Sequence, residues 1–254
     1  MKSALTLKSF VLLCSTLVIL VNILANALPF FGNTTGEISN RYATLFTPAS
    51  VTFSIWGLIY LLSVLFTMRF LTYDITHYPR SSFIIASSYG GLAIANITWL
   101  LLWHSNNIIA STIVLFVALF FALRLALHYK TLSNKANSLE KTFFTIYAAW
   151  LSVASIANVA IMFVAIDFTL PFSPVIWTIV VLIIATILAI LSQNALHSRA
   201  FPAVILWAFF GITIRHTANA ENNEPIIFIT TLVLMGVLLI ALFVFPKEKL
   251  TKAS

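Results

Sequence analysis

The chain has 254 residues, of which 61% are hydrophobic and only 8% are charged, and its formal net charge is +7. Soluble domains carry about 25% charged residues, so this composition excludes a soluble protein and indicates a polytopic membrane protein. The positive charge does not indicate nucleic-acid binding, because the basic residues lie between apolar runs, where they act as topology signals. We therefore expect membrane lipids as partners and no nucleic acid.

Eight apolar runs are candidate membrane spans, which predicts an all-α integral membrane protein built as a helical bundle. They lie at 9–28, 48–70, 81–103, 107–129, 142–166, 174–195, 200–216 and 225–246. The seventh run has about 17 residues and is the shortest, so its crossing is the least secure.

Lysine and arginine test this topology independently. With a cytoplasmic N-terminus and eight crossings, twelve of these residues lie on the cytoplasmic side and only Arg41 and Arg215 lie outside. If the seventh run did not cross, the split would weaken to 9 against 5. The stronger split follows the positive-inside rule and predicts two cytoplasmic termini. We expect the membrane to be the bacterial inner membrane.

The first apolar run has two interpretations. Lys2, Lys8 and the sequence Ala25-Asn26-Ala27 resemble a signal peptide with a cleavage site. Against this, Asn22 and Asn26 lie one turn apart, and two amides on one face suit a helix packed in a bundle. We expect the run to be retained as a span.

The first outer connection, residues 29–47, is the longest on that side of the membrane. Within it, Glu37 and Arg41 are spaced for an i,i+4 ion pair. Its last residue, Thr47, can cap the next helix, and Pro48 suits the first turn of that helix. The connection is either an ordinary loop or a lid over the mouth of a pocket.

The spans carry few groups for chemistry. Every Asp and Glu lies outside the spans or at their ends, and no Lys lies in mid-span, which argues against a proton-coupled transporter or pump. The five histidines lie near span ends without metal-site spacing, so we expect interfacial residues and no metal. One cysteine, Cys14, excludes a disulfide within the chain. We expect no catalytic residues.

Aromatic side chains follow one face of the second span. Phe53, Trp56 and Tyr60 fall at i, i+3 and i+7, and Gly57 beside them would let a neighbouring backbone or a ligand come close. The face is either a packing seam between helices or the wall of a pocket for a flat apolar ligand. A pocket requires matching walls from other helices.

Two further spans supply matching stripes. The third span carries Asn96, Trp99 and Trp103 on one face, and the fifth carries Tyr147, Trp150, Ala154 and Asn158. Membrane amides commonly bond a neighbouring helix, and Trp103 has the position of an interfacial belt residue. Together the three stripes could enclose an aromatic cavity with a few polar contacts. Trp177 and Trp207, in later spans, are interpreted as belt or packing residues.

These stripes resemble the TspO/MBR family, the tryptophan-rich sensory proteins related to the translocator protein. The second-helix pattern of the family is similar to Pro48, Phe53, Trp56 and Tyr60, its third-helix pattern to Asn96 and Trp99, and its fifth-helix pattern to Tyr147, Trp150, Ala154 and Asn158. The resemblance covers residues 9–166. It implies a five-helix bundle that binds porphyrins or other hydrophobic molecules beneath the loop 29–47.

On this resemblance we expect two units, a TspO-like five-helix bundle at 1–166 and a three-helix extension at 167–254. The expected function is binding or sensing of a planar hydrophobic ligand, with a porphyrin or haem as ligand rather than as a fixed cofactor. A permease for a small amphipathic solute and an enzyme acting on its bound ligand are the alternatives, and a homodimer stays open. The expected ligand-binding residues are Phe53, Trp56, Tyr60, Asn96, Trp99, Tyr147, Trp150 and Asn158.

Overall fold

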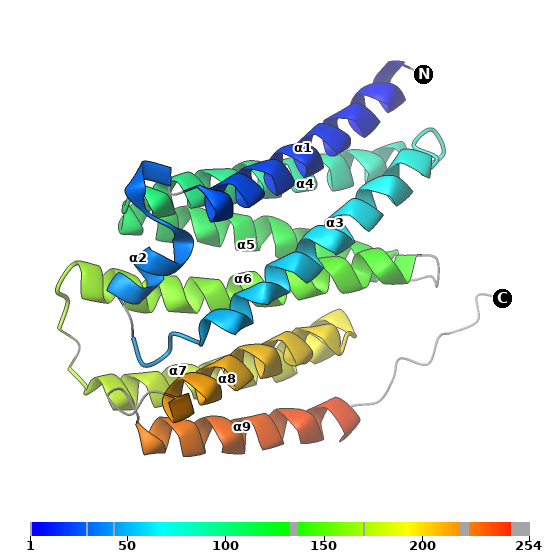
Figure 1. The fold of residues 1–254 in the computed structure, drawn as a ribbon. Helices are drawn as coiled ribbons and strands as arrows, with labels where there is room; N and C mark the ends of the chain where they lie inside the picture. The colour runs from blue at the N-terminus through cyan, green and yellow to red at the C-terminus, as the bar shows by residue number, and fades with distance from the viewer. Residues whose placement is uncertain are drawn as a thin grey trace.

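The computed structural model describes residues 2–28, 30–42, 44–132, 137–169, 171–218 and 224–244. These residues form helices and no strand (Figure 1). Several residues of the topology argument lie outside the described part, namely Lys135 and the lysines of 245–254.

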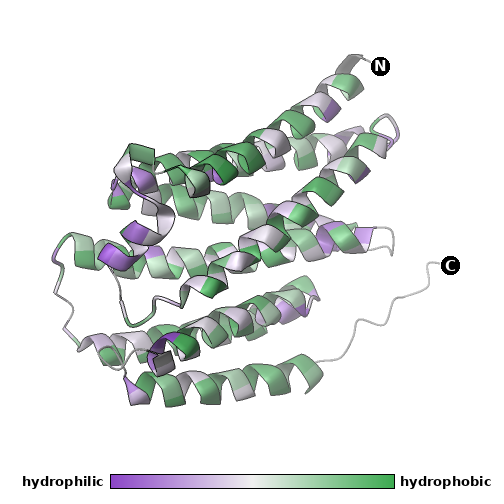
Figure 2. Ribbon diagram, viewed as in Figure 1, coloured by the Kyte–Doolittle hydropathy of each residue, from purple (hydrophilic) through white to green (hydrophobic). Residues whose placement is uncertain are grey.

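The eight expected spans are confirmed as eight long apolar helices. Their bounds are α1 Lys2–Ala27, α3 Ile55–Thr72, α4 Pro79–His104, α5 Ile108–Thr131, α6 Ser138–Ala165, α7 Pro174–Leu196, α8 Ala200–Ala218 and α9 Pro225–Val244. The seventh span, the least secure from the sequence, is 18 residues long and apolar on average, about 27 Å of helix. Hydrophobic residues follow the lengths of the helices, while hydrophilic ones gather toward their ends (Figure 2).

The helices pack as neighbours in two connected groups. α4 packs between α1 and α5, α5 packs on α6, and α3 contacts α1 and α6. α7, α8 and α9 contact one another, and α8 also packs against α6 (Figure 1). The start of α1 and the end of α9 lie at the same end of the bundle, as eight crossings require (Figure 1).

Hydroxyl and amide groups join helices within the bundle. Ser63 on α3 lies 3.0 Å from the Ser15 hydroxyl of α1 and 2.7 Å from the Tyr89 hydroxyl of α4. Gln193 on α7 donates to the Ala241 carbonyl of α9. Such bonds are worth about 0.6–2 kcal/mol each between membrane helices, so they help to fix the helix contacts.

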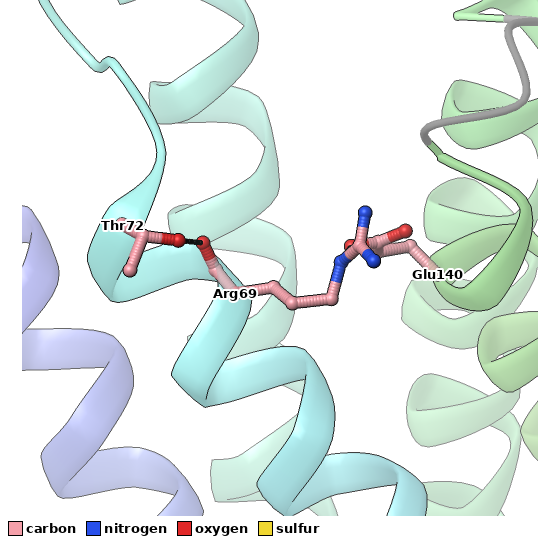
Figure 3. Close-up of polar contacts among 3 residues, drawn as sticks. All are labelled: Arg69, Thr72 and Glu140. Carbon is pink, nitrogen blue, oxygen red and sulfur yellow. Dashed lines mark hydrogen bonds and ion pairs between the residues drawn. The ribbon is translucent and has the colours of Figure 1, made fainter.

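One ion pair ties α3 to α6 at the end opposite the short helix α2 (Thr35–Arg41). Arg69 Nε lies 2.6 Å from Glu140 Oε1 (Figure 3). The carboxylate side chain is 7% exposed, whereas the arginine side chain is 48% exposed. Because one partner keeps contact with solvent, the pair contributes less than a fully buried one.

The second span begins differently from the prediction. A short 3₁₀ helix, η2 Ser50–Ser54, precedes α3, and neither Thr47 nor Pro48 belongs to a helix. The Thr47 hydroxyl accepts a hydrogen bond from the Thr44 backbone N–H (2.9 Å). The predicted cap at Thr47 and first turn at Pro48 were therefore wrong, because contacts with α8 determine the backbone here.

Three hydrogen bonds hold residues 45–52, the docked segment, against α8. They join Leu45 O to His216 Nε2 (2.9 Å), Ala49 N to Gly211 O (2.9 Å) and Thr52 O to Trp207 Nε1 (2.9 Å). Gly211 permits this approach, since an added Cβ would lie 2.9 Å from Thr52 Cβ and 3.1 Å from Pro48 Cβ. Trp207 is thus an anchor for the docked segment and more than a belt residue.

Candidate ligand-binding site

Rings from three helices meet at Trp56. Its indole stacks on Tyr60 of the same helix (5.8 Å between centroids) and on Trp99 of α4 (6.4 Å). Tyr147 and Trp150 of α6 approach it edge-on at 6.0 and 6.3 Å. These offset-stacked and edge-to-face arrangements are the favourable ones for aromatic pairs. The stripes of the second, third and fifth spans therefore converge.

A cavity of about 370 Å³ lies beside this cluster. Its wall includes four of the predicted residues, Phe53, Trp56, Tyr60 and Trp99. Tyr147 and Trp150 are not in the wall; they are buried behind Trp56, and Trp150 also contacts Phe53 edge-on at 6.0 Å. The cavity volume falls within the range of about 300–1,000 Å³ that is usual for small-ligand sites.

The two amides predicted for the site, Asn96 and Asn158, lie in different places from each other. Asn96 accepts a hydrogen bond from Asn22 Nδ2 (2.9 Å), and Asn22 itself lines the cavity. Asn158 donates to the hydroxyls of Ser111 and Thr112 on α5 (3.2 Å each). Asn158 therefore joins α5 to α6, the interhelical role that membrane amides commonly have, and the cavity wall does not include it.

The roof of the cavity is α2 Thr35–Arg41, which supplies Thr35, Gly36, Ser39 and Asn40 to the wall. The described residues of the loop 29–47 thus form a structured cover. The expected Glu37–Arg41 pair is replaced by a capping box. The backbone N–H and hydroxyl of Thr34 donate to the Glu37 carboxylate and hold its pKa below the usual value, while Arg41 donates to Asn33 Oδ1 (2.7 Å).

The roof is anchored to the end of α4. Trp103 Nε1 donates to the Thr35 carbonyl (3.3 Å), and the Thr35 hydroxyl lies 3.3 Å from His104 Nε2. Asn33 Nδ2 also donates to the His104 carbonyl (3.3 Å). Trp103 and His104 lie at the end of α4 as predicted, but both are buried beneath the roof rather than exposed at the surface. Both sit where the roof covers the end of the helix, which shields them from the surroundings.

Several buried donors beside the cavity have no partner in the described part of the chain. They are Trp99 Nε1, Trp150 Nε1, the Tyr147 hydroxyl and Asn96 Nδ2. A buried donor without an acceptor costs about 1–3 kcal/mol. Trp99 belongs to the cavity wall, and its indole N–H is one of these buried donors.

Gly57 does not have the expected role in packing. An added Cβ at this position would meet nothing within 4 Å, and the residue is exposed. The close approach predicted for Gly57 occurs at Gly211 on α8 instead, where the docked segment crosses. The docked segment itself supplies Pro48 and Ser50 to the cavity wall, so α8 positions part of the site.

The sequence predicted the loop 29–47 as a cover, but it singled out neither Asn22 nor Ser39 as a wall residue and did not predict the docking of residues 45–52 on α8. Asn22 was noted only as a packing amide, and its pairing with Asn96 could not be predicted because 74 positions separate them. Ser39 lies in a short helix whose capping box, Thr34 with Glu37, was a readable signal. The contacts with α8 left no periodic pattern in the sequence.

Comparisons with known proteins address the chain as a whole. Residues 8–244 match the family model described as TSPO-like protein. The match extends over all eight spans, beyond the residues 9–166 that carry the aromatic motifs. No curated protein and no solved structure matches the chain.

Proposed function

Because the chain belongs to the TSPO-like protein family, as the match over 8–244 shows, we propose that it binds a planar hydrophobic ligand in the cavity beneath α2. The observation that carries this proposal is the convergence of Trp56, Tyr60 and Trp99 along one wall of a cavity that no described charged residue lines. A flat apolar molecule gains both area burial and ring stacking there. A porphyrin or related tetrapyrrole is the proposed class.

The ligand edge is recognised by hydrogen-bond donors. Trp99 is a wall residue, and its Nε1 is buried without a partner in the described part of the chain. Tetrapyrroles carry acceptor groups at the ring edge, so such a ligand satisfies this donor while its plane lies against the indoles. A tetrapyrrole is large for about 370 Å³, so the proposal includes an outward movement of α2 on binding.

The proposal also covers the orientation of the protein in the membrane and its division into two units. The protein is an integral membrane protein, and the two ends of its helix bundle face opposite sides of the membrane. The 12-to-2 distribution of basic residues supports cytoplasmic termini, which puts α2 and the cavity on the outer side, and the bacterial inner membrane is the proposed location. We keep the division into 1–166 and 167–254 as a proposal. The second unit then supports the first through α8.

Tryptophan quenching by protoporphyrin tests this function. Purified protein in a neutral detergent should show saturable quenching. Trp56→Ala should raise the apparent Kd at least tenfold, about 1.4 kcal/mol, because the ligand loses its stacking surface. Trp177→Phe is the matched control, since Trp177 lies outside this cavity. Non-saturable quenching would contradict the proposal, as would equal affinity in wild type and Trp56→Ala.

A second variant keeps the test decisive if Trp56→Ala does not fold. Ser39 is buried in the roof and lines the cavity, so Ser39→Leu fills part of the volume without altering any ring. It should weaken porphyrin binding while the thermal unfolding midpoint changes little. Proteoliposome flux of the same porphyrin separates binding from the permease alternative, which requires vectorial transport.

A further inference from the structure

A second cavity, of about 620 Å³, is lined by residues of α6, α7 and α8. The end of α6 and the start of α7 lie at the α2 end of the bundle (Figure 1). It is formed by the last turns of α6, the connection to α7, the first two turns of α7 and the end of α8. Residues 44–46, which precede or begin the docked segment, close its remaining side. None of the residues proposed for the first cavity lines it.

The body of this cavity is apolar and aromatic. Phe163 contacts Phe168 (5.1 Å between centroids) and Trp177 (6.1 Å). On α7 the wall runs from Pro174 to Val181, about 10 Å along the helix axis. An alkyl chain or another apolar group is therefore covered over most of its length when it enters from the end of the bundle.

Two opposite charges border this apolar body. Asp167 follows α6 in a left-handed backbone conformation (φ 50°), and Arg215 lies in the last turn of α8. Neither the Asp167 carboxylate nor the Arg215 guanidinium forms a hydrogen bond or an ion pair with another described residue. Both charges line the same cavity and are available to a bound molecule.

His216, the third polar group of interest in the cavity wall, already has hydrogen-bond partners at both ring nitrogens. Its Nε2 donates to the Leu45 carbonyl (2.9 Å), and its Nδ1 accepts from the Glu224 backbone N–H (3.4 Å). Both ring nitrogens thus have partners, and the ring fixes the wall of the cavity. Among the described lining residues, only Asp167 and Arg215 select for the charge of a ligand.

We propose that this cavity binds a zwitterionic amphiphile, a molecule with an apolar tail and a headgroup that carries one anion and one cation. The anionic group pairs with Arg215, the cationic group pairs with Asp167, and the tail lies among Phe163, Trp177 and Val181. A purely anionic headgroup would meet repulsion from Asp167, and a neutral one would leave both charges without partners. Phosphatidylethanolamine has this chemistry, and the cavity lies at the helix ends, where lipid headgroups are found.

Native mass spectrometry in a neutral maltoside detergent tests the proposal. The protein is titrated with phosphatidylethanolamine, phosphatidylglycerol and diacylglycerol of identical chains, and with glycerophosphoethanolamine, the headgroup without chains. Phosphatidylethanolamine should bind with one saturable site and at least fivefold more tightly than the other three. Equal binding of the three lipids would overturn the proposal, and equal binding of the chain-free headgroup would assign the cavity to a small solute instead.

Charge variants distinguish this site from general lipid adhesion. Arg215→Gln should lower the affinity for phosphatidylethanolamine about tenfold. Asp167→Asn should lower that affinity less and should raise the affinity for phosphatidylglycerol, because the repelling carboxylate is gone. Arg80→Gln, which removes an exposed cation at the other end of the bundle, is the matched control and should change neither. Val181→Phe fills the floor of the cavity and should reduce binding of every lipid. Indistinguishable affinities in Arg215→Gln, Asp167→Asn and Arg80→Gln would overturn the proposal.

Discussion

The two cavities at the α2 end of the bundle differ in how their walls are made. The cavity beneath α2 takes its rings from helix faces, at positions with regular spacing in the sequence, and no described charge lines it. The cavity among α6, α7 and α8 takes its wall from helix ends and connections and is bordered by Asp167 and Arg215. Helix faces produce a readable pattern, whereas helix ends come together only through the tertiary fold.

One element belongs to both cavities. The docked segment supplies Leu45 and Phe46 to the larger cavity and Pro48 and Ser50 to the smaller one. Its hydrogen bonds to α8 therefore position a wall of each. The comparison implies that a substitution in α8 affects both cavities. A substitution in α2 should affect one cavity, and one at the opposite end of the bundle should affect neither.

The largest effect is expected from Gly211→Ala. The added Cβ would overlap the Thr52 side chain and press on Pro48, so the docked segment must shift. We expect a loss of about 1–3 kcal/mol in stability, with weaker binding of both the porphyrin and the lipid. The thermal unfolding midpoint and the two titrations measure this.

Gly236→Ala is the matched control for that substitution. An added Cβ at Gly236 on α9 meets nothing within 4 Å, so helix propensity alone acts and stability should stay equal or rise by up to about 1 kcal/mol. If Gly211→Ala behaved like Gly236→Ala, the docked segment would not be a shared wall.

The next effect concerns the ion pair at the far end. Arg69→Met leaves the Glu140 carboxylate buried without its cation, which should cost about 1–2 kcal/mol, below the 3–5 kcal/mol of a fully buried pair because Arg69 is half exposed (Figure 3). Affinities at both cavities should remain within twofold of wild type, as titrations at a temperature below unfolding will show. A selective loss of porphyrin binding would mean that the far end controls the site.

A smaller effect is expected at the roof. Trp103→Phe keeps the ring that stacks on Trp99 (6.0 Å) but removes the hydrogen bond to the Thr35 carbonyl, worth about 1 kcal/mol. Stopped-flow quenching should show faster porphyrin association and dissociation with a small change in affinity, while lipid binding is unchanged. Unaltered rates would show that this contact does not hold α2 closed.

The smallest effect is a pH dependence of α2. The pKa of Glu37 is lowered by its hydrogen bonds with Thr34, so the carboxylate stabilises the start of α2 above the unfolded pKa, and this contribution is lost as pH falls through the folded value. Amide exchange in α2, corrected for intrinsic rates, should increase between about pH 6 and about pH 3 in wild type. Glu37→Gln should show no such step, and a step of equal size in that variant would assign it to another group.

Much of the fold was predictable because the membrane requires long apolar helices and places basic residues between them. The aromatic stripes were predictable for a similar reason, since residues at i, i+3 and i+7 share a helix face. That Trp56, Trp99 and Trp150 would meet was a hypothesis, and the ring distances now support it.

Other features follow from contacts between distant positions and could not be derived in this way. The late start of α3 results from the hydrogen bond between Ala49 and Gly211, and the role of Trp207 results from its bond to Thr52, 155 positions away. Local propensity favoured a cap at Thr47, and tertiary contacts outweighed it. The larger cavity had no signal at all, because its residues come from three separate stretches of the chain, 44–46, 160–181 and 215–216.

Fluorine NMR on protein labelled with fluorotryptophan tests the central claim most directly, with each of the six signals assigned by single substitution. On addition of protoporphyrin, the ring current of a stacked ligand should shift the resonances of Trp56 and Trp99 strongly, with a weaker shift at Trp150 behind them. The resonances of Trp177 and Trp207 should stay within their linewidths. A strong shift at Trp177, or unshifted resonances at Trp56 and Trp99 under saturating porphyrin, would contradict the account.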